Sequence, residues 1–187
     1  MRGLMITMLV AGVAIAGCGK SPSSPSAMSS LNVRITDSPF SDAKAVLVTF
    51  NEVAAHRSES DWTTIPFVGG GRRTCDLKKL QGAEDVLGVG SLTSGRYTQI
   101  RLVVERAELF FDTASNGPAC APTIESPAGA SAQATVASGT IRLNRQFQLE
   151  AADTTTIVLD FDGDGSIVQT SAGTYVMTPI VSIVSLQ

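Results

Sequence analysis

Carboxylates at alternate positions are the residues of this sequence best suited to bind an ion. Asp160, Asp162 and Asp164 precede Gly165, as in the opening of a calcium-binding loop, where a glycine permits the sharp turn. Hard oxygen donors suit Ca²⁺, whereas Zn²⁺ prefers His or Cys. Ser171 occupies the twelfth position, where such loops carry a bidentate Glu. Two interpretations stay open: a calcium site at these three carboxylates that stiffens the fold, or a β-hairpin turn at residues 163–165 with no ion.

The N-terminal segment has the composition of an export signal. One positive charge is followed by an apolar run to Gly17, which is too short for a comfortable membrane span. The residues Ile15-Ala16-Gly17 before Cys18 resemble the bacterial lipobox. The resemblance implies a lipoprotein signal peptide at residues 1–17 and a Cys18 that carries diacylglycerol and a further acyl chain such as palmitate, which anchor the protein in a membrane. An ordinary signal peptide that contains a cysteine is the alternative.

Composition divides the rest of the chain into a tether and one domain. Residues 18–30 are rich in Ser and Pro and have little to bury, so we expect a flexible tether after the lipidated cysteine. The folded domain is expected over residues 31–187. Gly19, where an Asp would indicate retention in the inner membrane, favours the outer membrane of a Gram-negative organism, on its periplasmic or its surface face. We therefore expect a lipid-anchored protein of the cell envelope.

Two cysteines remain once Cys18 is assigned to lipid. Cys75 and Cys120 would lie in an oxidising compartment in an exported protein, and this favours an intramolecular disulfide between them. Such a bridge would join the segment before Asp76 to a long stretch, residues 113–138. That stretch is rich in Ala, Ser and Pro and carries one charge, so we expect a loop inserted in the domain.

Period-two alternation of apolar residues predicts an all-β fold. Residues 97–111 form the longest alternating segment, with Ile100 on the face opposite to Gln99, Arg101 and Glu105. About seven such segments, separated by Gly, Pro, Asn and Asp, indicate a β-sandwich or an open barrel with little or no helix, and we expect a single immunoglobulin-like sandwich. Tyr97 opens the longest segment, and we expect its ring to be buried and its hydroxyl to bond a nearby backbone group.

Charge and residue types give little support to catalysis or to nucleic-acid binding. Lys and Arg number 14 against 17 Asp and Glu, so no basic excess exists to bind a phosphate backbone. His56 is the one histidine and has no metal partner near it in sequence. Glu105 and Glu108 lie three apart on a predicted strand, which places them on opposite faces. Trp62 is expected in the core, with a sugar-stacking role as the alternative.

Several blocks of sequence, taken in order, resemble one family of exported bacterial and archaeal proteins. The blocks are residues 33–39, 48–53, 76–81, 95–104, 159–162 with 166–167, and 175–180. Their order is similar to that of the family catalogued as domain of unknown function 4382. The resemblance implies a β-sandwich outside the cytoplasm, often on a lipoprotein, with strands arranged as in transthyretin-like or carbohydrate-binding-like domains. It implies no activity, ligand or catalytic residue.

These features predict a non-enzymatic lipoprotein that is anchored to a membrane and carries a β-sandwich for binding, adhesion or envelope structure. Its expected partners are the membrane, through the anchor, and a carbohydrate or an envelope protein, but no nucleic acid. No cofactor is expected beyond the possible calcium. The alternative is a calcium-dependent carbohydrate-binding module that uses Asp160–Asp164 together with Trp62. A hydrolase with carboxylates remote in sequence is a third hypothesis, and it predicts a pocket with two converging carboxylates.

Overall fold

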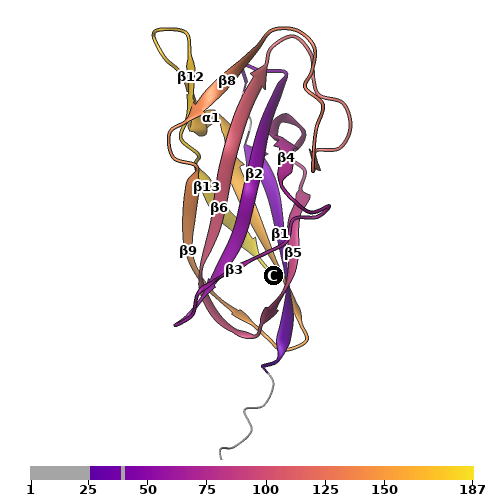
Figure 1. Cartoon of the computed structure of the whole chain (residues 1–187), viewed down its shortest axis with the longest axis vertical. Coiled ribbons are helices and arrows are strands. Elements are labelled where there is room, and N and C mark those ends of the chain that lie inside the picture. Colours follow the sequence, from indigo (N-terminus) through magenta and orange to yellow (C-terminus); the bar gives the residue numbers. More distant parts are fainter. Residues whose placement is uncertain (1–25, 39–40) are drawn as a thin grey trace, which may run out of the picture.

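The computed structural model describes residues 26–38 and 41–187, which fold into two packed β-sheets (Figure 1). A four-stranded sheet has the order β13-β10-β1-β5, and a nine-stranded sheet has the order β11-β12-β8-β6-β2-β4-β7, with β3 paired to β2 and β9 paired to β6. The strands are β1 (Met28–Ser38), β2 (Ala45–Arg57), β3 (Trp62–Thr64), β4 (Arg73–Asp76), β5 (Asp85–Thr93), β6 (Gly95–Phe110), β7 (Cys120–Ala121), β8 (Ser131–Val136), β9 (Thr140–Leu149), β10 (Thr154–Asp162), β11 (Ile167–Gln169), β12 (Tyr175–Met177) and β13 (Val181–Leu186). Two short helices, η1 (Leu77–Lys79) and α1 (Gly163–Ser166), complete the elements.

The core lies between the two sheets and is built by alternation. In β1, Leu31, Val33 and Ile35 are fully buried while the residues between them are partly exposed, because successive side chains of a strand point to opposite faces. The ring of Phe50 on β2 meets that of Phe161 on β10 edge to face, with the centroids 6.2 Å apart. This contact joins the two sheets across the core.

The long pair β2 and β6 forms the middle of the larger sheet. The two strands are antiparallel from Ala45 opposite Phe110 to Arg57 opposite Tyr97. Tyr97 is buried, its hydroxyl donates to the Thr93 carbonyl oxygen at 2.8 Å, and its ring stacks on Phe147. Both parts of the expectation for Tyr97 are confirmed. Burial raises the pKa of this phenol, and the nearby Arg57 opposes that rise.

The all-β class is confirmed, but the expected single sandwich of about seven strands is wrong in detail. The described residues hold thirteen strands in two mixed sheets. Several of these are two to four residues long, and a strand of that length shows no periodicity in sequence. The first strand begins at Met28 rather than near Leu31, and residues 85–93, which have Gly88 and Gly90 among them, form a full strand.

The stretch at residues 113–138 is also more ordered than an inserted loop. It contains β7 and β8, and β8 pairs with both β6 and β12. A second small apolar cluster lies under this stretch and consists of Ala45, Leu47, Phe110 and Ile124. The stretch thus covers part of the outward face of the larger sheet.

The expected disulfide is confirmed. Cys75 on β4 and Cys120 on β7 lie directly opposite each other, with their Cα atoms 4.1 Å apart. Both cysteines are buried, and the bridge fixes β7 to β4 at the edge of the sheet. Among the described residues, neither helix is long or apolar enough to cross a membrane.

Candidate functional site

The outward face of the larger sheet carries a band of polar side chains along β6. The band draws on β2, β3, β6, β8 and β9 and on the loop before β4, and its residues are partly or fully exposed. We call it the polar strip; it consists of Glu52, His56, Trp62, Arg72, Gln99, Arg101, Glu105, Arg106, Glu108, Gln133, Thr135, Arg142 and Asn144.

One end of the polar strip is a row that crosses four strands. Trp62 on β3 lies opposite His56 on β2, His56 lies opposite Gln99 on β6, and Gln99 lies opposite Asn144 on β9. Side chains of directly opposite residues share a face of the sheet. The Gln99 Nε2 donates to the Asn144 Oδ1 at 2.7 Å, and the His56 ring lies 5.2 Å from that of Trp62. We call this row the aromatic end.

Arg101 holds the indole of Trp62 in place. Its guanidinium carbon lies 4.4 Å from the centre of the Trp62 ring, which is the geometry of a cation–π contact. The same guanidinium donates to the Glu52 carboxylate through Nε at 2.8 Å and through a second nitrogen. Ala54 on β2 lies opposite Arg101 of β6 on one side and opposite Thr64 of β3 on the other. Because Ala54 has only a methyl group, the long arginine can cross above it. Trp62 is therefore half-buried on the surface rather than in the core, contrary to expectation.

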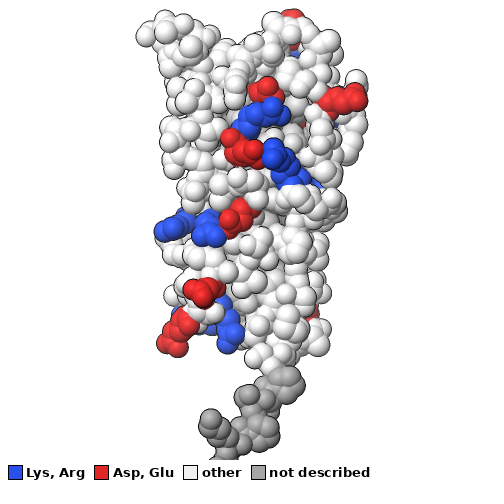
Figure 2. Space-filling model, viewed as in Figure 1, with Lys and Arg blue, Asp and Glu red and all other residues white. Residues whose placement is uncertain are grey.

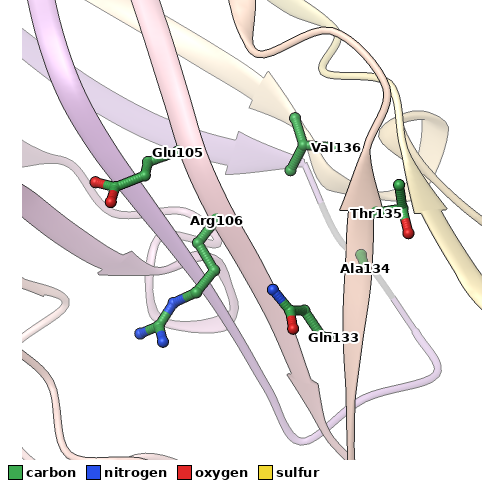
Figure 3. A pocket seen from close by; sticks show the side chains of 6 residues that line it. All are labelled: Glu105, Arg106, Gln133, Ala134, Thr135 and Val136. Carbon is green, nitrogen blue, oxygen red and sulfur yellow. The ribbon is translucent and has the colours of Figure 1, made fainter.

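The other end of the polar strip is a hollow where β6 changes partners. β6 pairs with β9 as far as Val103 and with β8 from Ala107 onward. The hollow at this fork has a volume of about 390 Å³. Its walls come from two strands, Glu105 and Arg106 of β6 and residues 133–136 of β8 (Figure 3). This volume falls within the range of small-molecule sites.

A β-bulge in β6 lies in the wall of the hollow. Phe50 lies opposite Val104 and Thr49 lies opposite Arg106, so Glu105 is an extra residue without a partner on β2. An extra residue reverses the alternation beyond it. The prediction that Glu105 and Glu108 lie on opposite faces is therefore wrong: both are on the outward face.

The charges of the polar strip are paired with one another. Figure 2 shows acidic and basic side chains in adjacent groups along this face, with no field of a single sign. Three pairs account for most of them: Arg101 with Glu52, Arg72 with Glu105 at 3.0 Å, and Arg106 with Glu108 at 3.4 Å. Arg142 is exposed and forms no ion pair in the described part of the chain. The surface is thus nearly neutral but dense in hydrogen-bonding groups.

Comparison with known proteins identifies the family. A family model described as a domain of unknown function (DUF4382) matches residues 28–179. The chain belongs to the DUF4382 family. No curated protein and no solved structure matches the chain. The matched range includes every residue of the polar strip and both cysteines of the disulfide, while Cys18 precedes it and lies outside the described residues.

In this DUF4382 domain, the three carboxylates of the predicted calcium loop have separate roles. Asp160 accepts a hydrogen bond from the Ser38 hydroxyl at 3.2 Å. Asp162 caps the helical turn α1 by accepting from the Gly165 backbone N–H at 2.8 Å. Asp164 is exposed within that turn. Across residues 26–38 and 41–187, no three Asp, Glu, His or Cys side chains are gathered as a metal site requires. The alternative of a hairpin turn is wrong, because β10 pairs with β13 and not with the strand that follows α1.

The DUF4382 domain also holds a buried carboxyl that sequence reasoning missed. Asp37, near the end of β1, is 5% exposed, and its Oδ1 accepts from the Gly163 N–H at 3.1 Å. Burial raises the pKa of Asp37 to about 8; the bond from Gly163 opposes this, Asp160 and Asp162 add to it, and Lys78 opposes it. In sequence the residue is only a polar group shortly before a proline, since its neighbours come from residues 78–81 and from β10 and α1, which are distant along the chain.

Proposed function

We propose that this protein is a non-enzymatic lipoprotein, anchored to a membrane through Cys18, whose β-sandwich domain binds a ligand outside the cytoplasm on the polar strip. The observation that carries the proposal is the strip itself. It combines a half-exposed tryptophan, an ordered amide pair and matched charges on one broad face. Such a face suits the recognition of an extended partner, with no fixed charge excess that would steer a polyanion.

The surroundings of His56 favour binding over catalysis. The His56 Nδ1 lies 2.9 Å from the Thr98 hydroxyl, which on its own resembles a nucleophile beside a base. In the described part of the chain, however, no carboxylate accepts a hydrogen bond from the other ring nitrogen to orient the ring. The ring instead packs beside Trp62. A catalytic triad needs the third group to fix the tautomer of the histidine.

Two further features support an envelope location. The Cys75–Cys120 disulfide is of the kind that persists in oxidising compartments. In Figure 1 the N-terminal end of β1 lies at the lower end of the molecule, and β8 and β12 lie at the upper end. A chain anchored ahead of β1 would therefore hold the hollow of the polar strip away from the membrane. We also propose that the domain is similar to immunoglobulin-like or transthyretin-like sandwiches and that the protein resides in an outer membrane.

The anchor is tested by Cys18→Ala in the full chain. We expect the wild type to incorporate labelled palmitate and to fractionate with membranes, and we expect the variant to lose the label and to leave the membrane fraction. Cys120→Ala, which removes a different cysteine, is the control and retains the label. A Cys18→Ala chain that is still labelled and still held in membranes would contradict the anchor.

The binding role is tested with isolated envelope material of the source organism. The full chain, purified in mild detergent, is sedimented with this material. We expect Gln99→Ala combined with Asn144→Ala to reduce the bound fraction by about tenfold, because the pair supplies the amide groups of the aromatic end. Val184→Ala, at an exposed position of β13, is the matched control. Equal sedimentation of all three proteins would contradict a binding role for the polar strip.

A further inference from the structure

We propose that the polar strip binds an uncharged oligosaccharide chain that lies along β6, with Trp62 as the residue that stacks on a sugar ring. This inference rests on the proposed function and names its ligand class. It draws on three properties of the strip: the aromatic end, the free atoms of the amide pair and the pairing of charges. The hollow at the fork adds a second contact region.

Trp62 offers an apolar surface in an otherwise polar face. The indole is half-exposed, and His56 on the neighbouring β2 and Arg101, which reaches it from β6 across β2, fix its orientation. A large rigid aromatic ring with few rotatable bonds provides contact area at low entropic cost, and its N–H can donate to a hydroxyl. The C–H face of a sugar ring, bordered by hydroxyls, has the matching chemistry. A peptide side chain would not use the ordered amide groups farther along the same row as fully.

The amide pair on β6 and β9, which β2 separates from Trp62, is prepared for a hydroxyl. Since the Gln99 Nε2 donates to the Asn144 Oδ1, the Gln99 Oε1 stays available as an acceptor and the Asn144 Nδ2 as a donor. A hydroxyl group donates and accepts at once, so one hydroxyl, or two on adjacent carbons, can satisfy both atoms. The bond between the two amides also holds them in register before a ligand arrives, which lowers the entropic cost of binding.

The charges of the polar strip select against polyanions. Four arginines (Arg72, Arg101, Arg106 and Arg142) face three glutamates (Glu52, Glu105 and Glu108), and three of the arginines are already paired. A sulfated or phosphorylated polymer would have to compete with these carboxylates. A neutral polyhydroxyl chain can accept from the outer N–H groups of the arginines without breaking any pair.

The dimensions of the polar strip suit a chain rather than a single sugar. From Gln99 to Glu105 the strand advances by roughly 20 Å, at about 3.3 Å per residue. The aromatic end and the hollow of about 390 Å³ are therefore separated by the length of several sugar rings. Gln133 and Thr135 of β8 supply further polar atoms beside the hollow (Figure 3). We expect longer oligosaccharides to bind more tightly than short ones, because they reach both ends.

The single tryptophan of the chain makes the test specific to the site. The full chain in detergent is titrated with hexaoses of β-1,4-glucan, β-1,3-glucan, α-1,4-glucan, xylan and chitin, and acrylamide quenching of the Trp62 fluorescence is recorded. We expect at least one hexaose to protect Trp62 from quenching, with a dissociation constant at or below about 1 mM, and its disaccharide to bind about tenfold more weakly. Asn144→Ala should weaken the effect by about tenfold, and Val184→Ala should leave it unchanged.

Two results would overturn the inference. One is the absence of protection by any neutral hexaose up to about 10 mM, or protection by heparin or by a peptide only. The other is binding of a hexaose that leaves the quenching of Trp62 unchanged, since the ligand would then lie elsewhere. Sedimentation with periodate-treated envelope material separates this failure from that of the proposed function. Periodate cleaves vicinal diols. Binding that survives periodate treatment would therefore contradict a glycan ligand but would not contradict a binding role for the domain.

Discussion

Two polar regions of this domain differ in how their carboxylates are paired and buried. On the polar strip each carboxylate has an arginine beside it, including Glu108, whose Oε2 is buried without a hydrogen-bond partner among the described residues. Where β1 and β10 end, Asp37 is buried beside Asp160 and Asp162, and its Oδ2 has no hydrogen-bond partner among the described residues. Surface ion pairs contribute little to stability, whereas a buried and poorly partnered carboxyl costs free energy. We therefore expect the strip to serve binding and the Asp37 region to control how stability depends on pH.

The largest effect is expected from Asp37→Asn. Because the pKa of Asp37 is about 8 in the folded state and about 3.9 in an unfolded chain, the folded state keeps a proton that the unfolded state loses between these values. The free energy of unfolding of the wild type therefore falls as the pH rises from about 4 to about 8, by up to roughly 6 kcal/mol from this group. The asparagine variant lacks this fall and should be the more stable protein at pH 8.

Urea unfolding curves from pH 4 to pH 9 measure this difference. Asp164→Asn, at an exposed carboxylate of α1, is the matched control and should follow the wild type. Parallel pH profiles for the wild type and Asp37→Asn would show that the buried carboxyl does not control the stability. The Asp37 region would then have no special role in the pH dependence of stability.

The second effect concerns the support of the polar strip. Replacing Cys75 and Cys120 together with alanine opens a loop with a sequence separation of 45 residues. In the chain-entropy account this costs about 4 kcal/mol of unfolding free energy. The loss should also loosen the β4 side of the strip, where Arg72 reaches Glu105. Urea unfolding of the double variant checks the number, and a midpoint equal to that of the wild type would mean that the bridge is not a constraint.

A smaller effect is expected on the polar strip itself. Arg101→Ala removes one ion pair and one cation–π contact, and should lower the unfolding free energy by only about 1 kcal/mol. Its effect on binding to envelope material should be larger, about tenfold, because Trp62 loses the group that orients it. Arg145→Ala, at an exposed position of β9, controls for the loss of a positive charge. If Arg101→Ala lowers the unfolding free energy by more than the disulfide variant does, the main role of Arg101 is to stabilise the fold and not to orient Trp62.

The smallest effect is expected from calcium. Asp160 and Asp162 already bond Ser38 and Gly165, and Asp164 points outward from them. We therefore expect Ca²⁺ and EGTA to shift the melting temperature by less than about 1 °C, since a ligand stabilises only the state that binds it. A rise of several degrees in millimolar Ca²⁺ would restore the calcium loop and would give the acidic region a binding role as well.

The sequence predicts local features well and contacts between distant segments poorly. Alternation in β6 is correct as far as Glu105, and it fails at Glu108 because the bulge adds a residue that no pattern reveals. The disulfide can be predicted from the cysteine count, since two cysteines remain after Cys18 is assigned to lipid. The site does not follow in this way. Arg101 reaches Trp62 across β2, and Asp37 is enclosed by residues of β10 and α1, so both depend on pairings that are set by the whole fold.

The central claim is that the polar strip, and not the acidic region, is the binding surface. The most direct test compares two variants in one sedimentation experiment with envelope material, the combined Gln99→Ala and Asn144→Ala chain and the Asp37→Asn chain, each also unfolded in urea at pH 8. The account predicts that the first loses binding by about tenfold with little change in stability, and that the second gains stability and binds as the wild type does. Full binding by the first, or lost binding by the second, would contradict it.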